Sequence, residues 1–214
     1  MRILTLDAAL ARCGAAVVDE HGVLAERFRD GPRGAAAGLA ALAGAALQAA
    51  GGTVDLVAVT VGPGSFTGLR AALALAHGYA AAAECKLVAV SVGEALRAAL
   101  ADDSGRAVWV AIDSRRGTVF LDRNGDIASW ALEALPAPAG PLAIAGDAAI
   151  AVAARLAARG TDTLLTDARL PAPAAIAAAA RQRIAGALPP LAPQPLYIDP
   201  PQTHAPASAP RPPP

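Results

Sequence analysis

The chain has 214 residues, in which 18 basic side chains balance 18 acidic ones and 55% of the residues are hydrophobic. This length allows a substantial core, and the charge balance excludes a global field that would attract nucleic acid or an anionic membrane. The N-terminal sequence does not resemble a secretion signal, and Cys13 and Cys85 form no C-x-x-C pair. We therefore expect a cytoplasmic protein with two free thiols and no membrane span.

The first hundred residues predict the element order of an α/β lobe. Three short strands come first, and then helices and strands alternate, as the spacing of apolar residues changes from two to three or four. The predicted strands are residues 2–7, 13–19, 22–28, 54–61 and 86–91. The predicted helices are residues 35–50, 66–83 and 92–101. This half therefore reads as an antiparallel meander followed by helix–strand pairs.

The second half repeats this order incompletely. A strand pair at 107–113 and 117–122 surrounds a turn, and a strand, a helix, a short strand and a helix follow at 141–146, 148–159, 162–166 and 173–186. An incomplete repeat of this kind is typical of two lobes side by side, the architecture of the actin, hexokinase and Hsp70 ATPase fold. We predict an α/β, two-lobed actin-like ATPase (ASKHA, ribonuclease H-like) fold, with an N-terminal lobe at 1–103 and a smaller, degenerate lobe at 104–198.

The chain is rich in proline after this second lobe. Eleven of the 26 residues from Pro189 onward are proline, and residues 199–214 offer few apolar side chains to bury. We therefore expect residues 199–214 to be a disordered Pro-rich tail, with docking to another protein as the alternative.

The stretch "VTVGPGSFTGLR", residues 59–70, has the glycines of a phosphate-binding loop but not its other groups. No lysine follows the glycines as it does in a Walker loop. Gly62, Gly64 and Gly68 are spaced one residue too widely for the dinucleotide fingerprint, and Pro63 lacks a backbone N–H. The spacing therefore favours a strand-to-helix turn.

The residues after these glycines leave two interpretations open. Ser65 or Thr67 can cap the following helix, and Arg70 lies in its first turn. The turn either lets strand and helix pack closely, or it contacts an anion at the helix N-terminus.

The sequence offers little for catalysis. His21, His77 and His204 lie far apart in a turn, a helix and the tail, so we expect no metal site and no catalytic residue. Asp7 ends the first strand, where this fold places the carboxylate that holds a nucleotide's metal ion, but Ala8 and further apolar residues follow it. We expect Asp7 to be a relic or a local cap. The weak candidates for nucleotide contact are Asp7, Gly64, Ser65 and Thr67.

Four segments together resemble the TsaB (YeaZ) family, a component of the bacterial machinery that makes threonylcarbamoyladenosine in tRNA. They are "RILTLD" (2–7), "GPGSFTGLR" (62–70), "VSVGEAL" (90–96) and "AIDSRRGTVF" (111–120). The likeness runs from residue 2 to about 122 and returns at "PLYI" (195–198). It implies a non-catalytic paralogue of TsaD with a degenerate actin-like ATPase fold.

The resemblance also implies partners. Such a protein pairs with and activates a TsaD-type subunit as an accessory scaffold, a TsaE-type ATPase joins them, and tRNA is met indirectly through the complex. It binds no cofactor alone, ATP or ADP with magnesium is expected at the partner interface, and a homodimer is expected in isolation. The alternative is an autonomous enzyme of the same fold, either a peptidase or a small ATPase.

Two predicted helices, 35–50 and 66–83, are nearly free of charge, although a helix that covers a sheet normally exposes a polar face to solvent. Mutual burial within one lobe is one explanation, and a subunit interface is the other. TsaB-like proteins use these two helices for pairing, which favours the interface. The expected interface residues are Leu39, Ala41, Leu42, Ala45, Leu69, Arg70, Leu73 and His77.

The turn of the second lobe's first hairpin gathers Asp113, Arg115 and Arg116. It is either a solvated turn with one ion pair or a polar contact to a partner or a tRNA phosphate. Three positions depart from the family pattern. Ala8 stands where Thr is usual, Thr118 where Glu is common and Asp199 where Arg is common.

Overall fold

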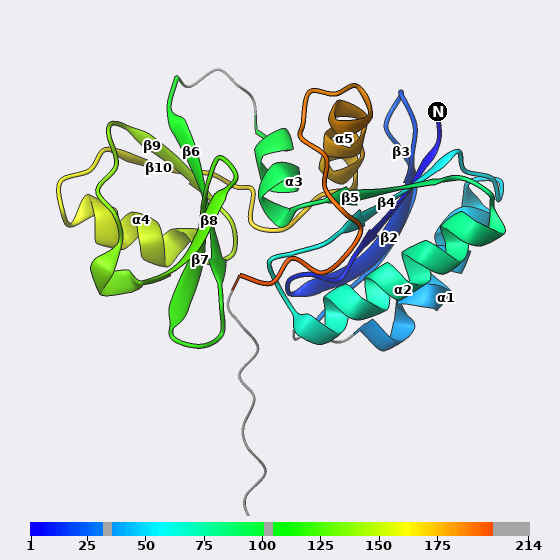
Figure 1. Ribbon diagram of the computed structural model, residues 1–214, viewed down its shortest axis with the longest axis horizontal. Coiled ribbons are helices and arrows are strands. Elements are labelled where there is room, and N and C mark those ends of the chain that lie inside the picture. The colour runs from blue at the N-terminus through cyan, green and yellow to red at the C-terminus, as the bar shows by residue number, and fades with distance from the viewer. Residues whose placement is uncertain (32–35, 101–104, 199–214) are drawn as a thin grey trace, which may run out of the picture.

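The computed structural model describes residues 1–31, 36–100 and 105–198, which form two α/β lobes side by side (Figure 1). Each lobe is built on one five-stranded mixed sheet. The predicted tail, with Asp199 and His204, lies outside the described residues. Within the described ranges, no helix has both the length and the apolar character needed to cross a membrane.

The sheet of the first lobe has the strand order β3-β2-β1-β4-β5. Its strands are β1 (Ile3–Asp7), β2 (Arg12–Val18), β3 (Val23–Asp30), β4 (Leu56–Thr60) and β5 (Lys86–Val90). The first three strands form the expected antiparallel meander, and β4 and β5 add to β1 in parallel. All residues of β1 and β4 are buried, which explains why apolar residues dominate both strands.

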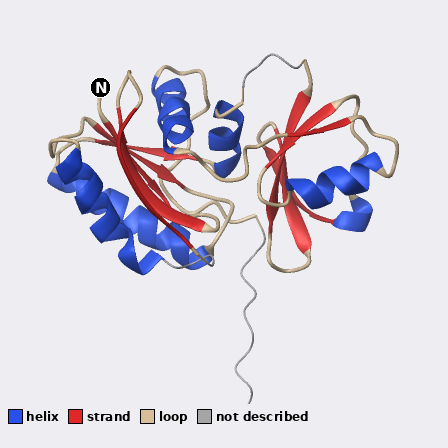
Figure 2. Cartoon of the chain, turned by 180° about the vertical axis from the view of Figure 1, so that it is seen from behind, coloured by secondary structure: helices blue, strands red, loops and turns tan. Residues whose placement is uncertain are grey.

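Helices cover both faces of this sheet (Figure 2). A short 3₁₀ turn, η1 (Ala36–Gly38), leads into α1 (Leu39–Ala49), which packs with α2 (Phe66–Ala82) on one face. On the other face α5 (Pro173–Ile184) packs through its buried alanines and Ile176. The apolar face of each helix packs against the apolar face of the sheet, and the two together form a layer of the core.

The sheet of the second lobe has the order β10-β9-β6-β7-β8. Taken from β8 to β10, this is the order of the first lobe from β3 to β5, strand for strand. Its strands are β6 (Ala107–Asp113), β7 (Thr118–Arg123), β8 (Asp126–Ala131), β9 (Leu142–Ala145) and β10 (Thr163–Leu165). The helix α4 (Ala149–Ala157) covers one face. Between β8 and β9 the chain makes only the short η2 (Leu132–Ala134), where the first lobe has α1. The second lobe is therefore the degenerate one, as predicted.

The helix α3 (Val92–Ala98) lies between the lobes and joins them. Its Val92 and Leu96 share a buried apolar cluster with residues of both lobes, among them Leu10 of the turn after β1 and Val110 and Ile112 of β6. Arg97 of α3 also forms an ion pair with Asp122 of β7, whose side chain is 1% exposed. A Cβ atom on Gly93 would lie 1.8 Å from Asp122 Oδ2, so only glycine permits this approach.

The end of the described chain returns to the first lobe. The sequence pattern assigns residues 104–198 to the second lobe, whereas in space α5 and residues 189–198 lie on the first. Leu191 and Leu196 pack against the core beneath α1 and α2, and the Leu196 N–H donates to the Val61 carbonyl at 2.7 Å. The alanine-rich pattern of α5 predicts a helix but carries no information about which sheet it covers.

Apart from this placement, the predicted elements agree with the structure. The helix expected at 35–50 is η1 followed by α1, and the helix expected at 92–101 ends at Ala98, before the undescribed residues 101–104. The strand β8 and the short η2 after it are not among the predicted elements, because the sequence there follows a turn without clear alternation of apolar residues.

Candidate functional site

Asp7 is buried at the end of β1, with 6% of its surface exposed. Its Oδ1 accepts hydrogen bonds from the Thr60 hydroxyl and, at 3.1 Å, from the Ala9 N–H. Its Oδ2 has no hydrogen-bond partner among the described residues. Burial raises the pKa of Asp7 to about 6, while the two hydrogen bonds and the nearby Arg12 oppose the rise.

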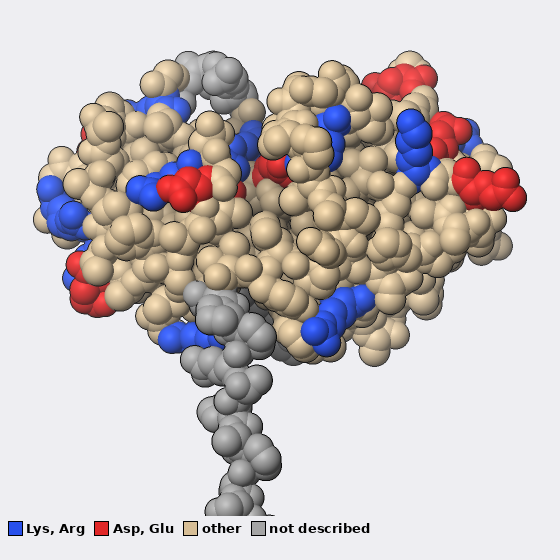
Figure 3. Space-filling model, in the orientation of Figure 1, with Lys and Arg blue, Asp and Glu red and all other residues tan. Residues whose placement is uncertain are grey.

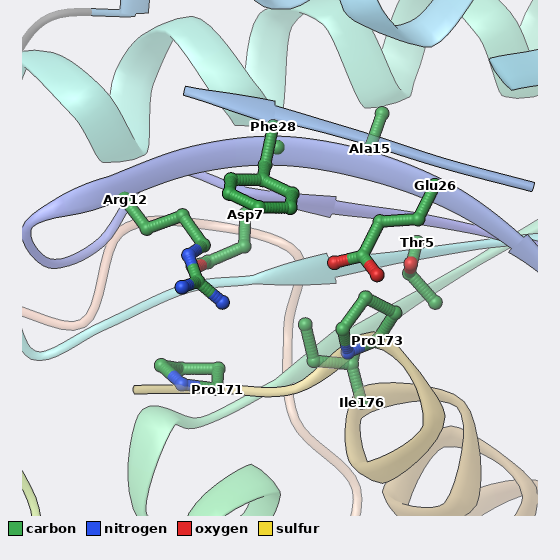
Figure 4. Close-up of a pocket in the computed structure, with 10 residues that line it drawn as sticks. Thr5, Asp7, Arg12, Ala15, Glu26, Phe28, Pro171, Pro173 and Ile176 are labelled. Atoms are coloured by element: carbon green, nitrogen blue, oxygen red, sulfur yellow. The ribbon is translucent and has the colours of Figure 1, made fainter. Parts of the chain in front are cut away.

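The space beside Asp7 is very small. A pocket of about 10 Å³ is lined by Asp7 and residues of three strands and α5, and Arg12 lies next to the carboxylate (Figure 4). That volume holds roughly one water molecule. The carboxylate therefore sits where the fold would hold a nucleotide's metal, but without room for a phosphate group.

The glycine loop, residues 62–68, closes over the turn that follows Asp7. A Cβ atom on Gly64 would lie 2.3 Å from the Ala9 carbonyl oxygen, and one on Gly68 would lie 2.0 Å from the Ala8 oxygen. The Ser65 N–H donates to the Ala9 carbonyl at 2.7 Å. The glycines thus allow two stretches of backbone to touch, which is the close-packing interpretation of the loop.

The start of α2 uses its polar groups locally. The Ser65 Oγ accepts from the Gly68 N–H at 3.1 Å and so is the N-cap, while Thr67 is exposed. The Gly62–Pro63 peptide bond is cis. Because the N–H groups of Ser65 and Gly68 are already engaged, this loop has fewer donors for an anion than its glycines suggest.

An aromatic and cationic cluster stands at the N-terminus of α2. The rings of Phe66 and Tyr197 stack with centroids 5.6 Å apart, and both side chains are exposed. The Arg70 guanidinium lies 3.8 Å from the Phe66 centroid, and its Nε donates to the Tyr197 hydroxyl at 2.9 Å. Of these three residues only Arg70 is predicted from the sequence as a contact residue, because Phe66 and Tyr197 lie far apart in the chain.

The turn between β6 and β7 is open to solvent. The Arg115 Nε forms an ion pair with Asp113 Oδ2 at 3.1 Å, and the Arg115 N–H donates to Oδ1 at 2.8 Å. Arg115 has a φ of 61°, in the left-handed region, and Arg116 is exposed beside it. This geometry is the ion-paired turn predicted, with two guanidinium groups at the surface.

A cleft of about 270 Å³ lies between this turn and the glycine loop. Its lining comes from three parts of the chain: residues 63–66, residues 114–116 with Phe120, and residues 196–198. The structure therefore brings Gly64 and Ser65 together with Arg115 and Arg116, which the sequence treats as separate candidates. It leaves Asp7 and Thr67 out of this lining.

Burial corrects part of the expected partner interface. Leu39, Leu69 and Leu73 face the core and are at most 5% exposed, so they cannot form a contact surface. An alanine-rich helix lacks the polar residues that would reveal which side faces the sheet. The expected residues that reach the surface are Ala41, Ala45, Arg70 and His77, with Leu42 partly buried.

The histidines do not meet in the described structure. His21 is exposed in a hairpin turn, and His77 Nε2 lies 3.1 Å from the Pro193 carbonyl oxygen. No group of three or more His, Cys, Asp or Glu residues that could hold a metal ion occurs within residues 1–31, 36–100 and 105–198.

Two lobes with the same sheet order, joined at a cleft, define the class of two-lobed actin-like ATPase-fold proteins. A family model described as "TsaD: tRNA N6-adenosine threonylcarbamoyltransferase" matches residues 36–184, more than half of the chain. The chain belongs to this family, and within it to the TsaB (YeaZ) proteins that the sequence motifs indicate.

One curated relative and two solved structures support this placement. The chain is 31% identical over 134 residues to the tRNA threonylcarbamoyladenosine biosynthesis protein TsaB of Escherichia coli (strain K12), and the match spans only 58% of each protein. A Pseudomonas aeruginosa structure described as an uncharacterized protein with similarity to peptidase YEAZ has a TM-score of 0.72 at 26% identity, covering 92% of this chain and 99% of the other.

The second structure, YeaZ from Pseudomonas aeruginosa, has a TM-score of 0.71 at 24% identity, with the same coverage of 92% and 99%. At that identity it supports the fold alone. The predicted fold class and the predicted family are both confirmed by these comparisons.

Proposed function

We propose that this chain is a non-catalytic accessory subunit in the synthesis of threonylcarbamoyladenosine in tRNA. In this role it pairs with a TsaD-type catalytic subunit and activates it. The family membership and the name of the Escherichia coli relative, a tRNA threonylcarbamoyladenosine biosynthesis protein, support the pathway. The shared face of α1 and α2 supports the pairing.

The observation that carries this proposal is the exposed side of α1 and α2. The eleven residues of α1 include no charged side chain, and α2 carries only Arg70 and His77. Figure 3 shows almost no charge over the lower part of the first lobe, where α2 lies. Exposed Ala41 and Ala45 on α1 and Ala74 and Gly78 on α2 would let another helix approach closely.

The packing around Asp7 supports an accessory role over independent catalysis. An actin-like ATPase needs space beside this carboxylate for phosphate and a metal ion. Here Gly64 and Gly68 bring the loop into contact with Ala8 and Ala9, and the remaining pocket is about 10 Å³. A nucleotide bound with magnesium at the interface with the partner, and a TsaE-type ATPase joining the pair, are parts of the same proposal.

The test places a charge on the proposed interface. Ala45→Arg and Ala41→Asp put an unpaired charge on the exposed side of α1, so we expect pairing with the cognate TsaD-type subunit to weaken by 100-fold or more, on the order of 3 kcal/mol. Light scattering on mixed, purified proteins gives the mass of the complex, and threonylcarbamoylation of tRNA should fall in parallel.

A matched control is Ala154→Asp, which places a charge at an exposed alanine of α4 in the other lobe. This variant should pair normally. Circular dichroism and thermal unfolding establish that all three variants are folded. Normal pairing by folded Ala45→Arg would contradict the proposed interface, and the mass of the chain alone reports whether the same face makes a homodimer.

A second candidate function is an autonomous enzyme, because a solved relative is described by its similarity to a peptidase. A peptidase or small ATPase would turn over substrate without a partner. Calorimetric titration with ATP and magnesium, together with hydrolysis assays on ATP and on casein, tests this directly. Turnover by the isolated chain that Asp7→Asn abolishes would favour the enzyme over the accessory subunit.

A further inference from the structure

The rim of the cleft between the lobes presents aromatic and cationic groups to solvent. We call this surface the cleft mouth, and it consists of Phe66, Arg70, Arg115, Arg116 and Tyr197. Phe66 is 52% exposed and Tyr197 is 44% exposed, although stacked rings of this size normally bury most of their area. Arg70 links the two rings, since it contacts the Phe66 ring and the Tyr197 hydroxyl together.

The other side of the cleft mouth adds positive charge. Arg115 is 61% exposed, and Arg116 beside it forms no ion pair within the described residues. Asp113 is the carboxylate of this turn, and it already accepts two bonds from Arg115. Figure 3 shows basic side chains at the lower edge of both lobes near their junction, whereas the chain as a whole is neutral.

These groups suit one kind of ligand. Guanidinium groups bind phosphate through two parallel hydrogen bonds, and exposed aromatic rings stack on nucleobases. The cleft, at about 270 Å³, has room for a phosphate and a sugar but not for a folded protein element. Its lining, within the described part of the chain, includes no Asp or Glu side chain that could hold the magnesium ion of a bound nucleotide.

We propose that the cleft mouth binds a single-stranded segment of the tRNA, with a backbone phosphate on Arg115 and Arg116 and a base on the Phe66–Tyr197 stack. This contact rests on the proposed function, which brings tRNA to the complex. It makes the subunit a direct contributor to tRNA binding, in addition to its pairing with the catalytic subunit.

The experiment measures binding of unmodified tRNA transcript to the assembled complex with the TsaD-type subunit, by fluorescence anisotropy across a range of salt concentrations. Arg116→Ala should lower the slope of log affinity against log salt by about 0.7, the value for one phosphate contact on a single strand. Phe66→Ala should weaken binding by about 10-fold at fixed salt, as expected for the loss of one stacked base.

Two variants on β3 are matched controls. Arg27→Ala removes an exposed guanidinium that donates a hydrogen bond to the neighbouring Glu26 carbonyl. Phe28→Ala removes a ring that is 48% exposed and lies, like Phe66, beneath an arginine, at 4.5 Å from Arg12. Neither residue lines the cleft, so both controls should bind tRNA as the unchanged complex does.

Each outcome decides the proposal. Unchanged tRNA affinity and salt slope in Arg116→Ala and Phe66→Ala would overturn it, while pairing and activation could still hold. If these variants lose pairing with the TsaD-type subunit instead, the cleft mouth is a protein contact and the RNA proposal fails. If the unchanged chain does not pair at all, the proposed function fails, and the same titrations on the chain alone then confirm or overturn the RNA contact.

Discussion

The turn after β1 in the first lobe and the turn after β6 in the second occupy equivalent places in two sheets of the same order, but their environments differ. Asp7 is buried, with one oxygen that has no partner in the part of the chain that the structure describes, whereas Asp113 is open and bonded to the Arg115 backbone and side chain. The difference comes from the segment after the fourth strand of each lobe. In the first lobe this segment is the glycine loop, which closes the turn.

In the second lobe the corresponding segment follows β9 and contacts β6 itself, before Asp113, and not the turn after it. Gly146 has a φ of 101°, and a Cβ atom on it would lie 2.1 Å from the Ala111 oxygen. Asp147 then accepts the Asp113 N–H at 2.9 Å, without covering the turn beyond it. Two sheets with the same strand order thus have one covered turn and one exposed turn. In the first lobe the glycines let the loop cover the turn, whereas in the second lobe Gly146 lets the loop contact the strand before the turn.

The largest expected effect concerns the link between the lobes. Arg97→Ala leaves Asp122 buried without its cation, so we expect the free energy of unfolding to fall by about 3–5 kcal/mol. Burial raises the pKa of Asp122 above its ordinary value even with Arg97 present. Urea unfolding measures the change. Arg106→Ala, which removes a more exposed pair with Asp162, should cost less than about 1 kcal/mol, and equal losses would contradict a buried link.

The next prediction tests the contact between the glycine loop and the turn after β1 in the first lobe. Gly68→Ala places a Cβ atom against the Ala8 carbonyl oxygen, so we expect a loss of about 3 kcal/mol in thermal or urea unfolding. Gly78→Ala is the control on the same helix, because nothing lies within 4 Å of its Cβ position. That change should stabilise the protein by about 0.5–1 kcal/mol. Similar effects at both positions would show that the loop does not press on the turn.

A third prediction uses the pKa of Asp7, which burial raises from 3.8 to about 6. The folded state then binds the proton more tightly than the unfolded state, so this group stabilises the fold at acidic pH and the contribution is lost as pH rises through 6. Relative to Asp7→Asn, the unchanged protein should lose about 2 kcal/mol of stability between pH 4.5 and 7.5.

Urea unfolding of both proteins at the two pH values measures this difference, and Asp167→Asn, at an exposed position, is the control. A gap between Asp7→Asn and the unchanged protein that does not vary with pH would mean that Asp7 is not buried as described.

The smallest effect concerns the open turn. Arg115→Gly removes a side chain from a left-handed position, which favours glycine, but also removes the exposed pair with Asp113. These effects oppose each other, and we expect the free energy of unfolding to change by less than about 1 kcal/mol. A larger loss would show that the turn of the second lobe is as tightly packed as that of the first.

The sequence predicts most of the fold because the spacing of apolar residues marks nearly every strand and helix. It also predicts that Ser65 or Thr67 caps α2, of which the structure uses Ser65, and it favours close packing by the glycine loop, since both depend on local spacing. It does not predict that Leu39, Leu69 and Leu73 face inward, because alanine on all sides hides the orientation of a helix. Nor does it predict the stack of Tyr197 on Phe66, which depends on the path of the chain between them.

The return of α5 to the first sheet has a consequence for biosynthesis on the ribosome. The strands of that sheet are all complete by Val90, yet one face, with Ile3, Leu56 and Val88, is covered by Ile176 and the alanines of α5. During translation this apolar face stays uncovered while more than eighty further residues are added. We therefore expect the nascent first lobe to expose this face to chaperones until residues beyond Pro173 leave the exit tunnel, and we expect the two lobes to complete folding together, although their sheets are separate in sequence.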